Sequence, residues 1–296
     1  MHQIKPALLA AIVILLMGLA SSAWAAPKSK LWERWATHNS ESQTNIDHST
    51  WSTVLSRHVV PSSDGINRFA YDKLANSPLD KKLLRDYLQN MAQIEISQYN
   101  RDQQLAYWIN LYNAITIAVV IEAFPVESIR DISDGLFSSG PWDRELMQVE
   151  GEMLSLNDIE HRILRPIWQD PRIHYAVNCA SIGCPNLQAE AFTAENVEVK
   201  LHSAAIEFIN HPRGASVVKG KLQVSSIYDW FEADFGGSEV GVIEHLRQYA
   251  DADLKAALNQ IDDIDNDSYD WNLNADYIPK VNDQNSKKQS GRSRGS

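Results

Sequence analysis

The chain has very few cysteines. Cys179 and Cys184 are the only two in 296 residues, and both lie within residues 170–185. A structural zinc site needs four ligands at regular spacing, and two cysteines with scattered histidines do not supply them. We therefore expect no bound metal and no cofactor. No cysteine lies near the end of the N-terminal apolar run, so a bacterial lipid anchor is not indicated either.

Long apolar runs are also scarce. One run, residues 7–20, follows Lys5 and precedes the small-residue stretch Ser21–Ala25. It is shorter than the ~20 residues that a membrane-spanning helix needs. A basic start, a short apolar run and an A-x-A exit predict a secretory signal peptide over residues 1–25, cleaved after Ala25. We expect no stable membrane span after cleavage and a periplasmic or secreted protein, in a compartment where disulfides persist.

The chain also has fewer basic residues than acidic ones, 27 against 38. The formal net charge is −11, and the C-terminal tail is locally basic, so the rest of the chain is more acidic still. This balance disfavours nucleic acid or an anionic membrane as the main partner, and we expect no nucleic acid to bind. A peptide or a small molecule stays open as a ligand, and protein partners are not predicted. The tail, residues 281–296, has almost no large apolar residues and is expected to be disordered.

The remaining residues have the composition of a globular protein, with 44% hydrophobic residues. We expect a helical N-terminal part over residues 26–94 and a core domain over residues 95–280. The strongest helix is predicted at residues 101–123, where apolar residues on most sides indicate a buried position. Ser77-Pro78 predicts the start of another helix.

Short strands are expected between the helices. Residues 146–156 read as two strands that turn at Glu150-Gly151, and residues 216–224 as a hairpin around Lys219-Gly220. Isoleucine, tyrosine and valine in residues 172–177 favour a further strand. These patterns together predict an α+β fold: a helix-rich single domain with a small antiparallel sheet.

The chemistry is expected at residues 170–185. A loop over residues 178–185 would carry Cys179 away from the end of the predicted strand, with His174 on that strand. A thiol beside an imidazole is the arrangement of nucleophilic catalysis. Because His174 and Cys179 are five positions apart, an unbroken strand would point them to opposite faces. His161, beside Glu160 on a predicted helix, is therefore an equal candidate for the base.

Two other interpretations stay open. A Cys179–Cys184 disulfide could join the ends of the loop, since export favours oxidation. Alternatively, Arg172, Asn178 and the loop amides could bind a carboxylate-bearing peptide or a thiol compound without turnover. Thiol redox exchange ranks lower on the sequence, because the spacing is wider than the C-x-x-C of thioredoxin-like sites.

Two asparagines stand out in the predicted central helix. Asn110 and Asn113 lie one turn apart, and a buried amide without a partner costs ~1–3 kcal/mol. They are expected either to bind the backbone of a nearby loop or to orient a catalytic group or substrate.

Four segments resemble the domain-of-unknown-function 547 (DUF547) family: residues 107–113, 156–161, 170–179 and 269–274. The similarity covers roughly residues 95–235 and extends more weakly to 280. The resemblance implies a fold related to papain-like or transglutaminase-like cysteine hydrolases. In those enzymes the cysteine precedes the histidine, whereas here it follows.

The resemblance also suggests site residues, because Cys179 and His174 fall on the family's central motif and Asn110, Glu160 and His161 on others. As a hypothesis, the Cys179 thiolate attacks an amide or thioester carbonyl. His161 or His174 is then the base, and Glu160 or Asn110 orients it. The chain would be a cysteine-dependent hydrolase or acyl transferase.

Overall fold

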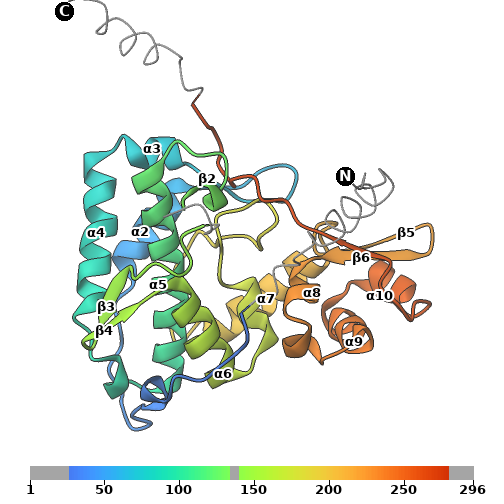
Figure 1. The fold of residues 1–296 in the computed structure, drawn as a ribbon, viewed down its shortest axis with the longest axis horizontal. Helices are drawn as coiled ribbons and strands as arrows, with labels where there is room; N and C mark the ends of the chain where they lie inside the picture. The colour runs from blue at the N-terminus through green and yellow to red at the C-terminus, as the bar shows by residue number, and fades with distance from the viewer. Residues whose placement is uncertain (1–26, 134–139, 280–296) are drawn as a thin grey trace, which may run out of the picture.

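A computed structural model describes residues 27–133 and 140–279. The predicted signal peptide and the predicted disordered tail lie outside the described residues. The N-terminal half is helical and surrounds one long central helix (Figure 1). Its α-helices are α2 (Ser49–His58), α3 (Tyr71–Ala75), α4 (Pro78–Ala92) and α5 (Arg101–Ala123).

Helices α4 and α5 begin where the sequence predicts. The Ser77 side chain accepts a hydrogen bond from the backbone N–H of Asp80, and Pro78 takes the first helical position, where a missing N–H costs nothing. Asn100 caps α5 in the same way by accepting from the N–H of Gln103. The prediction of a helix over residues 101–123 is confirmed.

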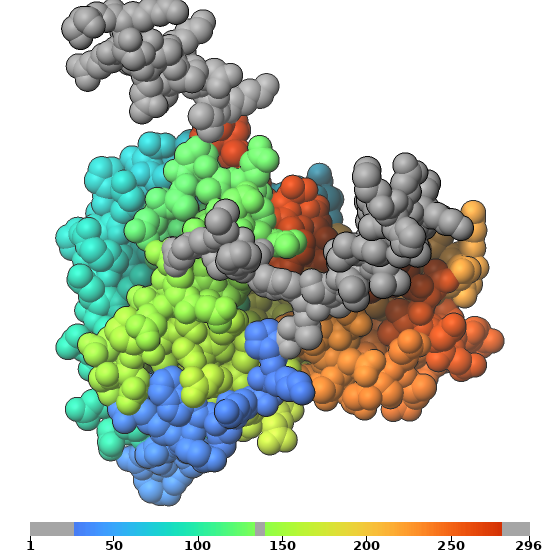
Figure 2. All heavy atoms as spheres, viewed as in Figure 1, coloured from blue at the N-terminus to red at the C-terminus, as the bar shows by residue number. Residues whose placement is uncertain are grey.

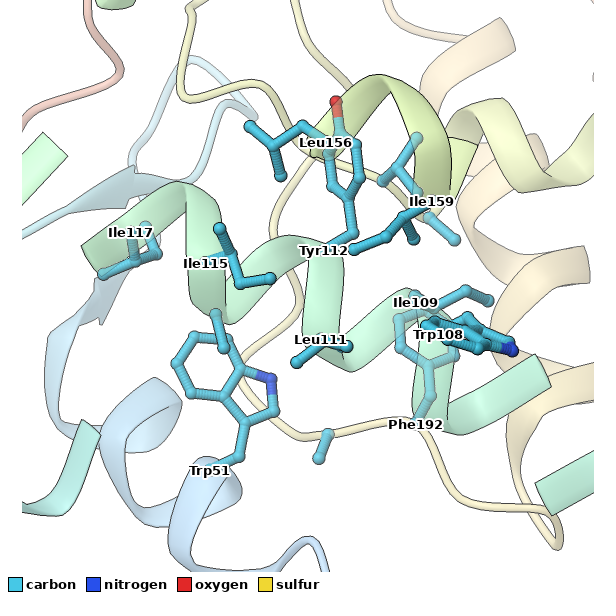
Figure 3. Packing of buried hydrophobic residues seen from close by; sticks show 14 of the residues in the cluster. Trp51, Trp108, Ile109, Leu111, Tyr112, Ile115, Ile117, Leu156, Ile159 and Phe192 are labelled. Carbon is cyan, nitrogen blue, oxygen red and sulfur yellow. The ribbon is translucent and has the colours of Figure 1, made fainter. Parts of the chain in front are cut away.

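Helix α5 is the centre of the larger apolar core. Among the described residues it is long and apolar enough to cross a membrane, but 89% of its most apolar window is buried inside the protein. Trp51 from α2 packs against one side, and Leu156 and Ile159 pack near the ring of Tyr112 on the other (Figure 3). Such burial is typical of the central helix of a globular core.

In residues 27–133 and 140–279 the strands form three separate small sheets rather than the single antiparallel sheet that we predicted. Two are hairpins, and the third adds a parallel strand to a hairpin. The strands are β1 (Val59–Val60), β2 (Arg68–Phe69), β3 (Met147–Val149), β4 (Glu152–Leu154), β5 (Ala215–Val218), β6 (Lys221–Ser225) and β7 (Asn266–Ser268). Both predicted turns are confirmed, and Glu150 and Lys219 adopt positive φ there. The parallel pairing of β6 with β7 was not predicted. The fold is helix-rich with small sheets, consistent with the α+β prediction.

The C-terminal half has a second apolar core of its own (Figure 1). Its helices are α7 (Val197–Ile209), α8 (Ile227–Trp230), α9 (Glu239–Tyr249) and α10 (Ala252–Leu258). Tyr175 belongs to this second core, whereas its neighbour Ala176 belongs to the first. The segment before Cys179 therefore passes from one core to the other.

The described residues also form irregular helices. A π-helix over Asp158–Leu164 continues directly into α6 (Arg165–Trp168). Short 3-10 helices occupy Glu33–Ala36, Ile96–Gln98, Ile129–Asp131, Pro171–Tyr175 and Glu232–Phe235.

The predicted strand at residues 172–177 is wrong, because residues 171–175 form a 3-10 helix. Asp170 caps it by accepting from the N–H of Arg172, and Pro171 is preorganised for the first turn. These start signals outweigh the strand preference of Ile173 and Tyr175.

Candidate functional site

Two free thiols meet at the loop that follows this 3-10 helix. Cys179 is partly exposed, whereas Cys184 is only 3% exposed. The backbone N–H of Cys179 donates to the Sγ of Cys184 at 2.9 Å. The hydroxyl of Tyr269 lies 3.0 Å from the Sγ of Cys179 and 3.1 Å from the Sγ of Cys184. One phenol thus contacts both sulfur atoms.

A strained turn brings the sulfurs together. Ala180 has φ of +62°, a left-handed conformation that costs a residue other than glycine roughly 1–3 kcal/mol. Hydrogen bonds on both sides hold it, since its N–H donates to Asn178 Oδ1 at 2.8 Å and its carbonyl accepts from the N–H of Asn274 at 3.0 Å. Ser181 then places its Oγ 3.2 Å from the Sγ of Cys179 and 2.8 Å from the Tyr269 hydroxyl.

Buried amides fix this turn to the central helix. Asn113 on α5 donates to the carbonyl of Ala176 at 2.9 Å and accepts from the N–H of Asn178 at 2.8 Å. The side chain of Asn178 also donates to the carbonyl of Pro185, beyond the second cysteine. Asn113 and Asn178 therefore set the positions of both cysteines, rather than facing a ligand.

Each thiol changes the pKa of the other. Burial raises the pKa of Cys184, but hydrogen bonds from Cys179, Tyr269 and Ser181 outweigh burial and lower it to about 6. Burial and the neighbouring Cys184 raise the pKa of Cys179. Burial and the two cysteines also raise the pKa of Tyr269, which therefore stays a hydrogen-bond donor. The pair carries one negative charge near neutral pH, and that charge rests on the buried sulfur.

This charge distribution predicts a specific titration. Thiolate absorbance at 240 nm should rise by one equivalent with a midpoint near pH 6, well below the ~8.5 of an ordinary cysteine. The variant Cys184→Ser should lose this step, leaving one thiol that titrates at a higher pH. Two equivalents that titrate together above pH 8 would contradict the shared charge.

After Cys179, Tyr269 is the side chain whose hydrogen bond lowers the pKa of Cys184 most. Replacing Tyr269 with phenylalanine removes the donated O–H but keeps the ring against Trp230 and Trp271. A hydrogen bond to a charged group contributes ~1.5–3 kcal/mol, so the midpoint should rise by about one to two pH units. Tyr277→Phe, at an exposed tyrosine, is the matched control and should leave the midpoint unchanged.

The predicted histidines gather in a second polar cluster. His174 Nε2 lies 2.7 Å from the carboxylate of Asp234, and its Nδ1 lies 3.8 Å from Glu160. Arg165 donates to the same Asp234 carboxylate at 2.6 Å and to His161 Nδ1 at 3.0 Å. Within the described ranges these side chains are all less than a quarter exposed.

Electrostatics in this cluster favour fixed protonation states. Burial raises the pKa of Asp234, but the hydrogen bonds from His174 and Arg165 prevail and hold it well below its usual value. Burial lowers the pKa of His161, so its ring is neutral at pH 7 and accepts from Arg165. Phe231 stacks on His174 with ring centres 4.3 Å apart and covers that ring.

The structure does not assemble the expected cysteine–histidine pair. In the part of the chain that the structure describes, the hydrogen-bond partners of the Cys179 sulfur are Ser181 and Tyr269, together with the neighbouring Cys184. Burial raises the pKa of Tyr112, and so do Glu160 of the second cluster and both cysteines, which lie near enough for their charges to act on its hydroxyl.

Two further candidate residues, Arg172 and Asn110, bind other parts of the protein. Arg172 pairs with Asp170 and Glu198, with N···O distances of 2.7 Å to each, and these carboxylates raise its pKa. Asn110 binds both backbone groups of Phe192, at 2.7 and 3.0 Å. Both side chains use their hydrogen-bonding groups within the fold.

Several residues of the site were not predicted. Tyr269 lay within the recognised motif at residues 269–274 but was not named as a candidate site residue. Ser181 lay between the two cysteines and was not named either. Tyr112 also lay within a recognised motif, residues 107–113, whereas Asp234 gave no signal beyond its residue type. Arg213, which lies near enough to Cys184 and Tyr269 to interact with their charges, was also missed. No group of three metal-ligating side chains occurs among residues 27–133 and 140–279.

Comparison with known proteins gives one match. Residues 96–209 match the family model described as "Protein of unknown function, DUF547". The resemblance read from the motifs is thereby confirmed, and the match includes both cysteines, both histidines of the second cluster and Glu160. No curated protein and no solved structure matches the chain.

Proposed function

Taking residues 96–209 as a DUF547 domain, we propose that the chain is an exported thiol–disulfide exchange protein that uses Cys179 and Cys184 as a pair. One observation carries this proposal: two free thiols lie against the same phenol hydroxyl, at 3.0 and 3.1 Å. The spacing of the cysteines differs from C-x-x-C, but the turn at Ala180 brings the backbone N–H of Cys179 to the Sγ of Cys184 and both sulfurs to the Tyr269 hydroxyl.

The two cysteines have different roles. Cys179 is the more exposed and meets the substrate, a disulfide of two thiol compounds or of a cysteine-containing peptide. Its proton passes to the Cys184 thiolate as the Cys179 sulfur attacks one sulfur of the substrate. The substrate disulfide breaks, a mixed disulfide forms on Cys179, and the first thiol product leaves with the proton from Cys184.

The second step completes the exchange. The Cys184 thiolate attacks the Sγ of Cys179, and the second thiol leaves as a thiolate. One disulfide is thereby lost and one is formed, so electrons and charge balance. The reverse sequence oxidises a dithiol substrate. Donation from Tyr269 stabilises the thiolate between steps, and the positive charge of Arg213 acts in the same direction.

The acyl-transfer alternative uses the same nucleophile on an amide or thioester. The family motifs and a kinship with papain-like or transglutaminase-like hydrolases would favour it. It requires a base at Cys179, and the structure has His161 and His174 bound instead to Arg165 and Asp234. Binding of a peptide or thiol compound with a permanent Cys179–Cys184 disulfide is the remaining alternative.

One experiment separates these functions. The reduced chain is mixed separately with glutathione disulfide and with a short thioester, and the products are mapped by mass spectrometry. Exchange predicts released thiol and an internal disulfide with the first compound only. An acyl adduct on Cys179 with no internal disulfide would instead identify an acyl transferase. A disulfide that native protein never loses to reducing thiols would identify a structural bridge.

A further inference from the structure

Pro166 leaves two carbonyl groups without a helical partner at the junction of the π-helix and α6. The carbonyl of a residue accepts from the fourth residue onward in an α-helix and from the fifth in a π-helix. Pro166 is the fourth residue after Arg162 and the fifth after His161, and it has no N–H to donate. Both carbonyls therefore need a donor from another segment.

Residues 27–32, which we name the strap, supply these donors. The N–H of Lys30 donates to the carbonyl of His161 at 2.9 Å, and the N–H of Trp32 donates to that of Arg162 at 3.0 Å. In an extended chain every second N–H points the same way, so the N–H groups of residues 30 and 32 can both donate to the π-helix. Figures 1 and 2 show this blue segment lying against the yellow-green region of the π-helix and α6.

A third contact joins the strap to the histidine cluster. Arg165 Nη1 donates to the carbonyl of Pro27 at 2.8 Å while it also contacts His161. The strap thus satisfies two carbonyls and one guanidinium with its backbone alone. These contacts require an extended backbone. Among the strap side chains Trp32 contributes most, since its ring centre lies 4.2 Å from the Arg162 guanidinium carbon.

From this geometry we infer that the His161–Arg165 edge is a binding site for an extended peptide, and that the strap occupies it in cis. Residues 27–31 are exposed, so Trp32 at the edge of the larger core is the main apolar contact of the strap, whereas the neighbouring Trp35 is anchored in that core. The strap can therefore leave without unfolding the protein. Its departure opens two acceptors and one donor to a second peptide. This inference does not depend on the thiol chemistry.

A matched pair of variants tests the cis contact. Lys30→Pro removes the N–H that binds His161, whereas Lys30→Ala keeps it, and both remove the same trypsin site. Loss of this hydrogen bond should speed cleavage after Lys28 by up to about tenfold in the proline variant relative to the alanine variant. Equal rates in the two variants would overturn the inference.

A second variant approaches the same contact from the helix side. Pro166→Ala restores a helical N–H that competes for these carbonyls, and it should also speed cleavage after Lys28. Unchanged strap cleavage in Pro166→Ala would overturn the role given to Pro166. This result stands even where Lys30→Pro disturbs folding.

Binding in trans completes the test. A labelled peptide with the sequence of residues 27–36 is titrated against Lys30→Pro and Lys30→Ala, and anisotropy is measured. The proline variant, whose site is empty more often, should bind the peptide more tightly, and a peptide with proline at the position of Lys30 should bind more weakly to both. A peptide that binds neither variant would overturn the peptide site.

Discussion

Replacing Cys179 with serine is expected to reduce the rate of disulfide exchange by about a thousandfold or more. A hydroxyl cannot form a disulfide, and the remaining Cys184 is too buried to meet a substrate directly. The measurement is thiol release from glutathione disulfide by the reduced protein. A variant that keeps more than a tenth of the wild-type rate would place the attacking sulfur elsewhere.

The variant Cys184→Ser is the matched control, because it should fail at a different step. Cys179 can still attack, but nothing expels the second thiol, so a mixed disulfide with glutathione should accumulate on Cys179. Mass spectrometry should detect about one glutathione per chain in this variant and none in Cys179→Ser. The opposite pattern would exchange the roles of the two cysteines.

Asn113→Ala is expected to lower the free energy of unfolding by about 2–6 kcal/mol. The change leaves the buried carbonyl of Ala176 and the buried N–H of Asn178 without partners, at ~1–3 kcal/mol each. A loss of this size is a large fraction of the stability of a typical domain. Urea unfolding followed by tryptophan fluorescence measures it.

Asn90→Ala provides the comparison for this prediction. Asn90 lies exposed on α4, so its loss should change stability by no more than about 0.5 kcal/mol. If the two variants unfolded at the same urea concentration, the Asn113 amide would not be what holds the Cys179 loop to α5. The thiolate titration of Asn113→Ala should also broaden or shift upward, because the turn would be less well fixed.

The sequence predicts the regular elements of this fold well. Helix α5 and the start of α4 follow from apolar spacing and from capping by Asn100 and Ser77. The two hairpins follow from their turn residues. These features depend on local interactions, which a sequence displays directly.

The errors come from competition between local signals and from distant contacts. The strand preference of residues 172–177 yields to the Asp170-Pro171 helix start. The three-sheet arrangement depends on which distant strands pair, and strand patterns alone do not specify that.

The candidate site was predicted in part. Both cysteines, Glu160 and the two histidines are identified by residue type and motif. Their grouping into two clusters was not predictable, because it depends on the left-handed turn at Ala180 and on Tyr269, which is remote in sequence. The low rank given to redox exchange rested on spacing along the chain, whereas the turn at Ala180 sets the actual distance.

A redox titration of the purified wild-type chain tests the central claim most directly. The protein is equilibrated with glutathione buffers of increasing oxidation, quenched by alkylation and mapped by mass spectrometry. The account predicts a single reversible transition between two alkylated thiols and a Cys179–Cys184 disulfide. Two free thiols at every ratio, or a disulfide that reducing buffers never open in the native protein, would contradict it.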